Sequence, residues 1–168
     1  MVPANHPLLA TLAGAWSLVN KTSYFPNGTI SPPSNDPLGS KPVGIIAYTS
    51  TGWVTMNSMA TEPALRPDWL TWPPQDNQTD ADWAVLGRHT YSYAGPVTDV
   101  VPRYPTAGSL VHGPLTFSNI PAQVGTAQHR DYELLDDASY LQLTVKLDTG
   151  NSGVLVWHRL PAEGNDDA

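Results

Sequence analysis

Three side chains in the middle of the chain have the chemistry of proton transfer: Arg88, Tyr91 and His112. An unperturbed imidazole titrates near pH 6.5, so His112 can serve as a general acid or base. A tyrosine can stack on a ligand ring and also exchange a proton. We therefore assign these three residues as candidate catalytic groups. Two plainer interpretations stay open, namely a hydrogen-bonded core histidine at 112 and helix packing for the polar and aromatic cluster at 88–93.

A second set of side chains could surround an apolar ligand. Its members are large aromatic groups together with a few hydrogen-bonding or cationic ones. We predict that the substrate-binding residues are Trp53, Asn57, Met59, Trp69, Trp72, Trp83, Tyr93, Gln128 and Arg130.

The cation in this set has a specific chemical requirement. Gln128, Arg130 and Tyr132 share one face of a predicted strand, so a guanidinium points into the fold if that face is the inner one. A buried arginine must be paired, or it must meet an anionic or carbonyl group. The alternative is structural: Arg130 closes one end of the fold through a cation–π contact with Trp16.

Strand patterns dominate the elements that position these residues. Alternation of apolar and polar residues predicts about eight strands, at 16–24, 43–49, 53–59, 109–117, 126–134, 140–147 and 153–160, with a weaker one at 97–101 between two prolines. Turn residues such as Ser50-Thr-Gly52 join neighbouring strands. We therefore expect one all-β domain over residues 1–168, an antiparallel barrel with flexible ends at 1–7 and 162–168.

Two segments interrupt the strands. Residues 26–42 contain five prolines and are predicted to form a loop. Residues 62–82 contain Trp69 and Trp72 among several prolines, and tryptophans are rarely left to solvent. We expect this loop to lie over the barrel mouth as a lid, with a plug or a dimer contact as alternatives. One short helix should begin at Thr79-Asp-Ala-Asp82 and end before Gly95-Pro96.

Charge and composition exclude several kinds of partner. Eight Lys and Arg against fifteen Asp and Glu give a net charge of −7, which argues against binding to nucleic acid or to anionic membranes. No apolar run approaches membrane-spanning length, and no basic region precedes the apolar run at 8–15, which is predicted to lead straight into the first strand. We expect a cytoplasmic protein, in which exposed tryptophans would permit a homodimer.

Cofactor and metal chemistry lack sequence support. There is no cysteine, and the five histidines have no metal-ligand spacing. Neither a Gly-x-Ser-x-Gly elbow nor a phosphate-binding or dinucleotide-binding glycine loop occurs. The sequence therefore predicts no cofactor and no metal.

A series of short motifs spans residues 8–161. They are Leu12-Ala-Gly-Ala-Trp16-Ser-Leu-Val, Pro37-Leu-Gly-Ser-Lys-Pro-Val-Gly44-Ile-Ile-Ala-Tyr48-Thr, Gly52-Trp53-Val-Thr-Met, Tyr93-Ala-Gly95, Val111-His112, Val124-Gly-Thr-Ala-Gln128-His-Arg130 and Leu155-Val-Trp157. In this order the chain resembles the lipocalin-like domain family of small bacterial and fungal proteins. The segments 63–82 and 96–108 depart from the usual pattern near the expected pocket mouth, so the ligand could differ from that of a relative.

The resemblance implies a lipocalin-like barrel and two alternative functions. Fungal members resemble tailoring proteins of secondary metabolism, which implies a cofactor-independent cyclase, isomerase or dehydratase acting on a hydrophobic, oxygenated polyketide or terpenoid. Such an enzyme would combine substrate preorganisation with proton transfer. The alternative is a non-catalytic carrier of a small apolar metabolite. A third hypothesis is a barrel filled by its own side chains that serves only for dimerisation.

Overall fold

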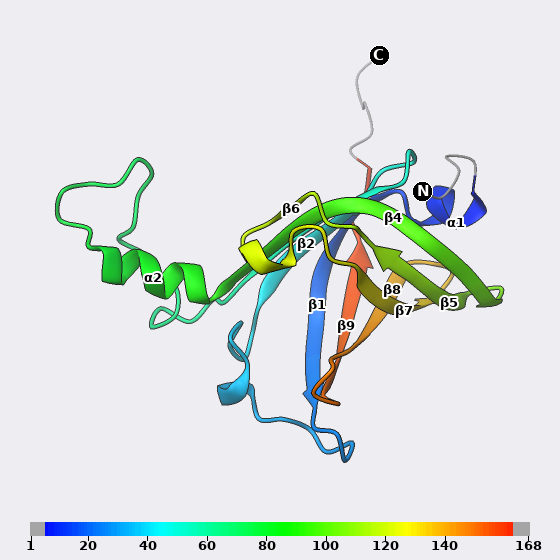
Figure 1. Ribbon diagram of the computed structural model, residues 1–168, viewed down its shortest axis with the longest axis horizontal. Coiled ribbons are helices and arrows are strands. Elements are labelled where there is room, and N and C mark those ends of the chain that lie inside the picture. The colour runs from blue at the N-terminus through cyan, green and yellow to red at the C-terminus, as the bar shows by residue number, and fades with distance from the viewer. Residues whose placement is uncertain (1–5, 163–168) are drawn as a thin grey trace.

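The computed structural model describes residues 6–162 and shows a closed antiparallel barrel (Figure 1). The ends were expected to be flexible at residues 1–7 and 162–168, of which residues 1–5 and 163–168 lie outside the described range. Pro7, which was counted in the first of these ends, is the first residue of a helix. Eight strands form the ring in the order β3-β2-β1-β9-β8-β7-β5-β4, and pairing of β3 with β4 closes it. Their bounds are β1 Gly14–Tyr24, β2 Val43–Tyr48, β3 Trp53–Met59, β4 Thr90–Tyr104, β5 Ala107–His112, β7 Gln128–Leu135, β8 Tyr140–Lys146 and β9 Ser152–Arg159.

One end of the barrel is closed by the helix α1, Pro7–Leu12. Leu9, Leu12 and Trp16 are fully buried there, and the Trp16 Nε1–H donates to the Leu12 carbonyl at 2.9 Å. The sequence analysis had taken this apolar run as leading directly into the first strand, which was wrong. A proline in the first helical turn and a capping bond from the Leu8 N–H to the His6 ring at 3.2 Å favour a helix instead.

The strand β4 is much longer than the predicted segment 97–101. It continues through both Pro96 and Pro102, which had been taken as its boundaries. The pairing of β4 with β5 shifts register on either side of Val101–Pro102, so Pro102 lies where the ladder is already irregular. The short strand β6, Phe117–Ser118, pairs with β4 at Tyr93 and Ala94, before the β5 pairing begins. The added length places Tyr91 and Tyr93 within the barrel wall.

The predicted helix forms as α2, Asp80–Arg88. Thr79 and Asp82 form a reciprocal capping box, in which each backbone N–H donates to the other residue's side chain at 2.9 and 3.3 Å. Two short 3₁₀ helices, Pro33–Asn35 and Pro121–Gln123, lie in loops. Within residues 6–162, no helix combines the length and apolar character needed to cross a membrane.

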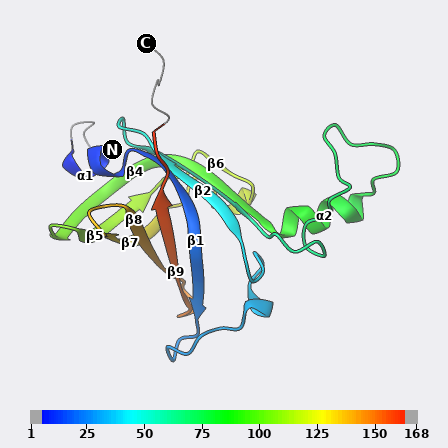
Figure 2. The ribbon, with the colours of Figure 1, turned by 180° about the vertical axis from the view of Figure 1, so that it is seen from behind.

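The Trp- and Pro-rich loop before α2 differs from the expected lid. Figures 1 and 2 show the loop and α2 extending to one side of the barrel, away from its ends. Trp72 is 84% exposed, and its nearest aromatic partner is Trp83 of α2, in an edge-to-face arrangement with centroids 6.4 Å apart. Trp72 therefore packs against α2, and the loop lies beside the barrel and not over its mouth.

The barrel wall opens between β7 and β8. Their pairing extends only as far as Asp131 and Thr144. Beyond that point β7 continues to Gln128 along β5, and β8 continues to Lys146 along β9. The two strands therefore part at the end of the barrel opposite α1. Arg130 lies on the section of β7 that pairs with β5 but not with β8.

Candidate functional site

The centre of the candidate site is His112, the last residue of β5. Gly113 ends the strand with φ +133°, where a Cβ would lie 2.7 Å from the Thr126 carbonyl oxygen. The imidazole is 0% exposed and contacts two hydroxyls from opposite sides. Tyr48 Oη lies 2.9 Å from Nε2, and Tyr93 Oη lies 2.8 Å from Nδ1. Strands β2, β4 and β5 therefore supply a continuous Tyr–His–Tyr chain within the barrel.

Burial fixes the protonation of this chain. Burial lowers the pKa of His112 well below its ordinary value, and the nearby positive charge of Arg130 lowers it further. Burial also raises the pKa of Tyr48 and of Tyr93 above the ordinary tyrosine value. All three groups are consequently neutral near pH 7. A neutral imidazole has one N–H donor and one acceptor nitrogen, so one tyrosine donates to the ring and the other accepts from it. The accepting tyrosine keeps its own proton available for a third group.

Tyr91 extends the cluster toward the surface. Its ring lies 5.5 Å from that of Tyr93, centroid to centroid, and its hydroxyl donates to the Gln123 amide oxygen at 2.7 Å. Burial raises the pKa of Tyr91, and the Tyr93 hydroxyl contributes to this rise. Tyr91 is half-buried while Tyr93 and His112 are fully buried, so it is the most accessible hydroxyl of the group.

Arg130 supplies the positive charge. Its side chain lies on the inner face of β7 together with Tyr132 and the half-buried Gln128, which is the face that the sequence analysis had left open. Arg130 is 8% exposed, and its Nη1 donates to the His129 carbonyl at 2.7 Å. Its charge opposes the rise that burial causes in the pKa of Tyr48, Tyr91 and Tyr93, and its side chain is also hydrogen-bonded to Tyr93. Among residues 6–162, no carboxylate lies within ion-pair distance of it.

Two hollows lie at this end of the barrel. A cavity of about 360 Å³ lies where β7 and β8 part; Arg130 borders it, but most of its lining, including His129, Asp131, Thr144 and Lys146, is on the outer face of these strands. A second, of about 240 Å³, is lined by the inward-facing Lys21, Val145 and Leu155 among others. Both volumes are near the lower limit for small-molecule sites.

The remaining predicted site residues are not brought to this cluster. Trp53 and Asn57 point outward from β3, because Val54, Met56 and Ser58 form its buried face. Met59, Trp72 and Trp83 line a separate groove of about 570 Å³ beside α2, and Trp69 is exposed in the neighbouring loop. Arg88 is exposed at the end of α2. Of the predicted catalytic residues, the structure therefore brings together Tyr91 and His112.

The sequence analysis missed Tyr48 and Gln123 as members of the cluster. Tyr48 could have been found, because it alternates with the buried Ile46 at the end of β2. Gln123 lies in the loop between β6 and β7, where periodicity gives no information. The alternative interpretation, a cation–π contact between Arg130 and Trp16, named the wrong arginine. Arg159 lies over Trp16, with Cζ 3.9 Å from the ring centroid.

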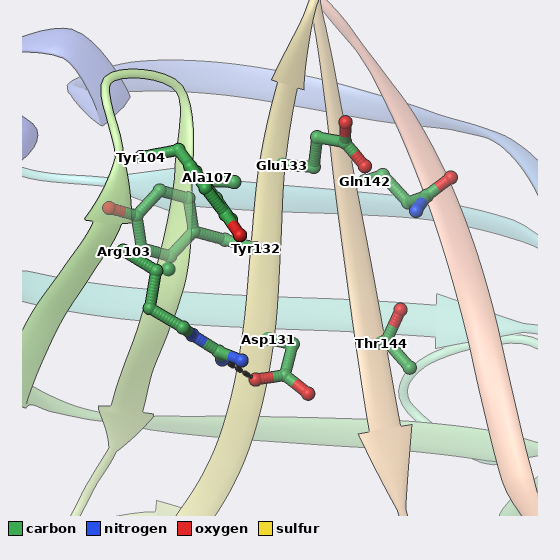
Figure 3. A pocket seen from close by; sticks show the side chains of 9 residues that line it. Arg103, Tyr104, Ala107, Asp131, Tyr132, Glu133, Gln142 and Thr144 are labelled. Atoms are coloured by element: carbon green, nitrogen blue, oxygen red, sulfur yellow. Dashed lines mark hydrogen bonds and ion pairs between the residues drawn. The ribbon is translucent and has the colours of Figure 1, made fainter.

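The outer surface of the same strands has a different character. Figure 3 shows a shallow hollow of about 200 Å³ on which Asp131 is ion-paired with Arg103. Asp131 follows Arg130 in β7, and successive side chains of a strand point to opposite faces. The outer charges thus neutralise one another and leave the inner guanidinium without a carboxylate. In the described part of the chain, no three His, Asp or Glu side chains gather as metal ligands.

Comparison with known proteins assigns the family. Residues 13–160 match the family model described as the lipocalin-like domain, so the chain belongs to that family. No curated protein matches the chain. Among solved structures, a redesigned beta barrel is similar to it at 12% identity over 91% of this chain and 95% of the other, with a TM-score of 0.41. That similarity is too low to add to the assignment. A barrel of this family is compatible with binding of a small hydrophobic molecule.

Proposed function

We propose that this barrel is a cofactor-independent enzyme that transfers protons within a hydrophobic, oxygen-bearing metabolite such as a polyketide or meroterpenoid. The observation that carries the proposal is the buried chain Tyr48–His112–Tyr93, whose two hydroxyls contact opposite nitrogens of one imidazole. Such a chain passes a proton from one end to the other without leaving a charge on the ring. The outcome is ring closure, a double-bond shift or loss of water, according to the substrate.

The residues have separate roles in this mechanism. Arg130 and Tyr91 hold a substrate carbonyl oxygen at the opening of the cluster, because a cation and a hydroxyl stabilise the negative charge that develops there. Tyr93 and His112 accept a proton from the carbon next to that carbonyl and return it at another position, so no net proton is consumed. The apolar wall holds the substrate in its reactive conformation, which supplies effective molarities of about 10⁵ M or more.

A deuterium-exchange experiment tests this proposal. Neutral enones, lactones and 1,3-diketones with apolar bodies are incubated with the protein in deuterium oxide, and mass spectrometry follows incorporation at carbon. We expect protein-dependent incorporation that falls by 10²-fold or more in Tyr93→Phe or His112→Gln. Tyr104→Phe, an exposed tyrosine on the same strand β4, is the matched control. Incorporation that is unchanged in both cluster variants, or that never exceeds the buffer rate, contradicts the proposal.

The alternative is a carrier for an apolar metabolite. One observation favours it: His112 is 0% exposed, so a ligand cannot contact the ring without movement of the surrounding side chains. A carrier would return the bound molecule with its mass and its carbon-bound hydrogens unchanged. The same exchange experiment therefore separates the two functions.

A further inference from the structure

Lys21 is an inward-facing group that takes no part in the proposed proton transfer. It lies on β1 directly opposite Leu155 of β9, which packs against the hydrophobic core. Its side chain is only 16% exposed. Burial lowers the pKa of Lys21 from the ordinary value of 10.5 to about 8, so more of this amine is neutral near neutral pH than of an ordinary lysine. A neutral amine is a nucleophile, whereas an ammonium is not.

The loop between β1 and β2 holds this amine. Strand β1 pairs with β2 only through Ser17, so the part of β1 that carries Lys21 has no neighbouring strand on that side. Loop residues adjoin it instead, and the Ser31 N–H donates to the Ser23 carbonyl at 2.8 Å. The same loop supplies Asp36, which is ion-paired with Lys21 and has a side chain only 11% exposed.

Asp36 is placed to accept a proton and to return it. Its Oδ2 contacts the Lys21 amine and accepts from the Ser23 hydroxyl at 3.0 Å. Its Oδ1 accepts from the Leu38 N–H at 2.9 Å, which fixes the carboxylate beside the amine. Ser23 Oγ also lies 3.5 Å from Lys21 Nζ. Amine, carboxylate and hydroxyl thus form a cluster that shares no residue with the Tyr–His–Tyr chain.

The cavity of about 240 Å³ adjoins this cluster and indicates what kind of molecule it can hold. Lys21, Ser23 and Asp36 line it together with the apolar side chains of Val145 and Leu155. Apart from the lysine and the aspartate, its lining residues are uncharged, and these two neutralise each other. An occupant of this cavity is therefore small and carries no net charge. A nucleophilic amine on such a wall is suited to react with a carbonyl group.

We propose that Lys21 is a second reactive site of the barrel, which binds a small, neutral aldehyde or ketone covalently as an iminium. The ammonium first gives a proton to Asp36, and the neutral amine attacks the carbonyl carbon. The carbonyl oxygen takes up one hydrogen from the amine nitrogen and the proton from Asp36, and it leaves as water. A C=N bond thus replaces the C=O bond, and the cationic iminium stays paired with the Asp36 carboxylate. This reaction goes beyond the proposed proton transfer and does not depend on it.

Reductive trapping tests this inference. The full-length protein is incubated at pH 7.5 with benzaldehyde and sodium cyanoborohydride, which reduces an iminium to a stable N-benzyl amine. Peptide mass spectrometry then compares the labelling rates of the three lysines of the chain, Lys21, Lys41 and Lys146. Lys41 and Lys146 are exposed and serve as internal controls. We expect Lys21 to be labelled at least 10-fold faster than either, although accessibility alone predicts the opposite order.

A substitution at Asp36 separates a reactive lysine from a structural ion pair. Asp36→Asn removes the group that accepts and returns the proton, so it should slow labelling of Lys21 at least 10-fold. Asp76→Asn, which removes an exposed carboxylate from another loop, is the matched control and should leave the rate unchanged. Circular dichroism establishes that both variants are folded.

Two results would overturn the inference. Labelling of Lys21 that is no faster than that of the exposed lysines would show that the buried amine is not reactive. Faster labelling in Asp36→Asn would show that the carboxylate only restrains a structural lysine. Either result leaves the deuterium-exchange test of the proposed function unaffected, because that test concerns different residues.

Discussion

Arg159 and Arg130 lie toward opposite ends of the same barrel and have opposite relations to their surroundings. Arg159 donates from Nε, Nη1 and Nη2 to the carbonyls of Ala138, Ala13 and Thr11, at 3.1, 3.0 and 2.6 Å, while its guanidinium covers the Trp16 ring. Arg130 donates to the main-chain carbonyl of His129 and is hydrogen-bonded to the Tyr93 hydroxyl, and it lies at the gap between β7 and β8. The first arginine is held by three main-chain carbonyls and an aromatic ring, whereas the second has one main-chain carbonyl and a tyrosine hydroxyl as partners.

The difference follows from what each end of the barrel must do. The helix α1 covers the end that holds Arg159, and the last turn of this helix presents free carbonyls that need donors. At the other end, β7 and β8 part beside Arg130, whose charge acts on the buried His112.

The comparison predicts a large difference in stability between two matched substitutions. Arg159→Met should lower the free energy of unfolding by about 3 kcal/mol, because three carbonyls lose charged donors and Trp16 loses its cation. Arg130→Met should cost less than about 1 kcal/mol or stabilise the fold, since it removes a buried charge that has no carboxylate. Urea unfolding followed by tryptophan fluorescence measures both. Equal losses would contradict the distinction between the two ends.

The open end should also make the protein sensitive to mild acid. The pKa of His112 is lowered in the folded state, so protonation favours unfolding; its contribution to stability is complete above the unfolded pKa of about 6.5 and is lost progressively as the pH falls below it. Between pH 7.5 and 5.5 we expect a loss of about 1 kcal/mol. Tyr48, Tyr93 and Arg130 face the ring, and only the histidine among these titrates in this window.

A non-titrating variant isolates that contribution. His112→Gln keeps one donor and one acceptor, and its unfolding free energy should change less between the two pH values than that of the unmodified protein. The carboxyls with lowered pKa values, Glu62 at about 2 together with Asp82 and Asp131, titrate below this range and do not interfere. An identical pH dependence in both proteins would show that protonation of His112 does not lower the free energy of unfolding.

The smallest effect is expected outside the barrel. Thr79→Ala removes half of the α2 capping box and should reduce hydrogen-exchange protection of the α2 amides by about 1 kcal/mol. Since α2 and its loop extend away from the barrel, the protein-dependent deuterium incorporation should stay within about twofold. A larger loss of incorporation would mean that the loop with Trp69 and Trp72 contacts the substrate after all.

Much of the fold could be predicted from the sequence, but the assignment of faces was less certain. Along β3, alternation separates Trp53 and Asn57 from Val54 and Met56, yet it does not say which set points inward. The amide and tryptophan were assigned to the lining, and the structure buries the other set. Along β1, the register shift between Leu18 and Asn20 reverses the alternation, so Lys21 joins the inner face.

Local patterns in the sequence determined most of the strands, the α2 start signal, the family motifs and the shared face of Gln128, Arg130 and Tyr132. These features depend on neighbouring residues, whose side-chain period and turn chemistry act over a few positions. Only the tertiary structure decided that Arg159 reaches Trp16 and that Tyr48, Tyr93 and His112 form one hydrogen-bonded chain. Those contacts join residues 19 to 143 positions apart, and their geometry is set by how the barrel closes.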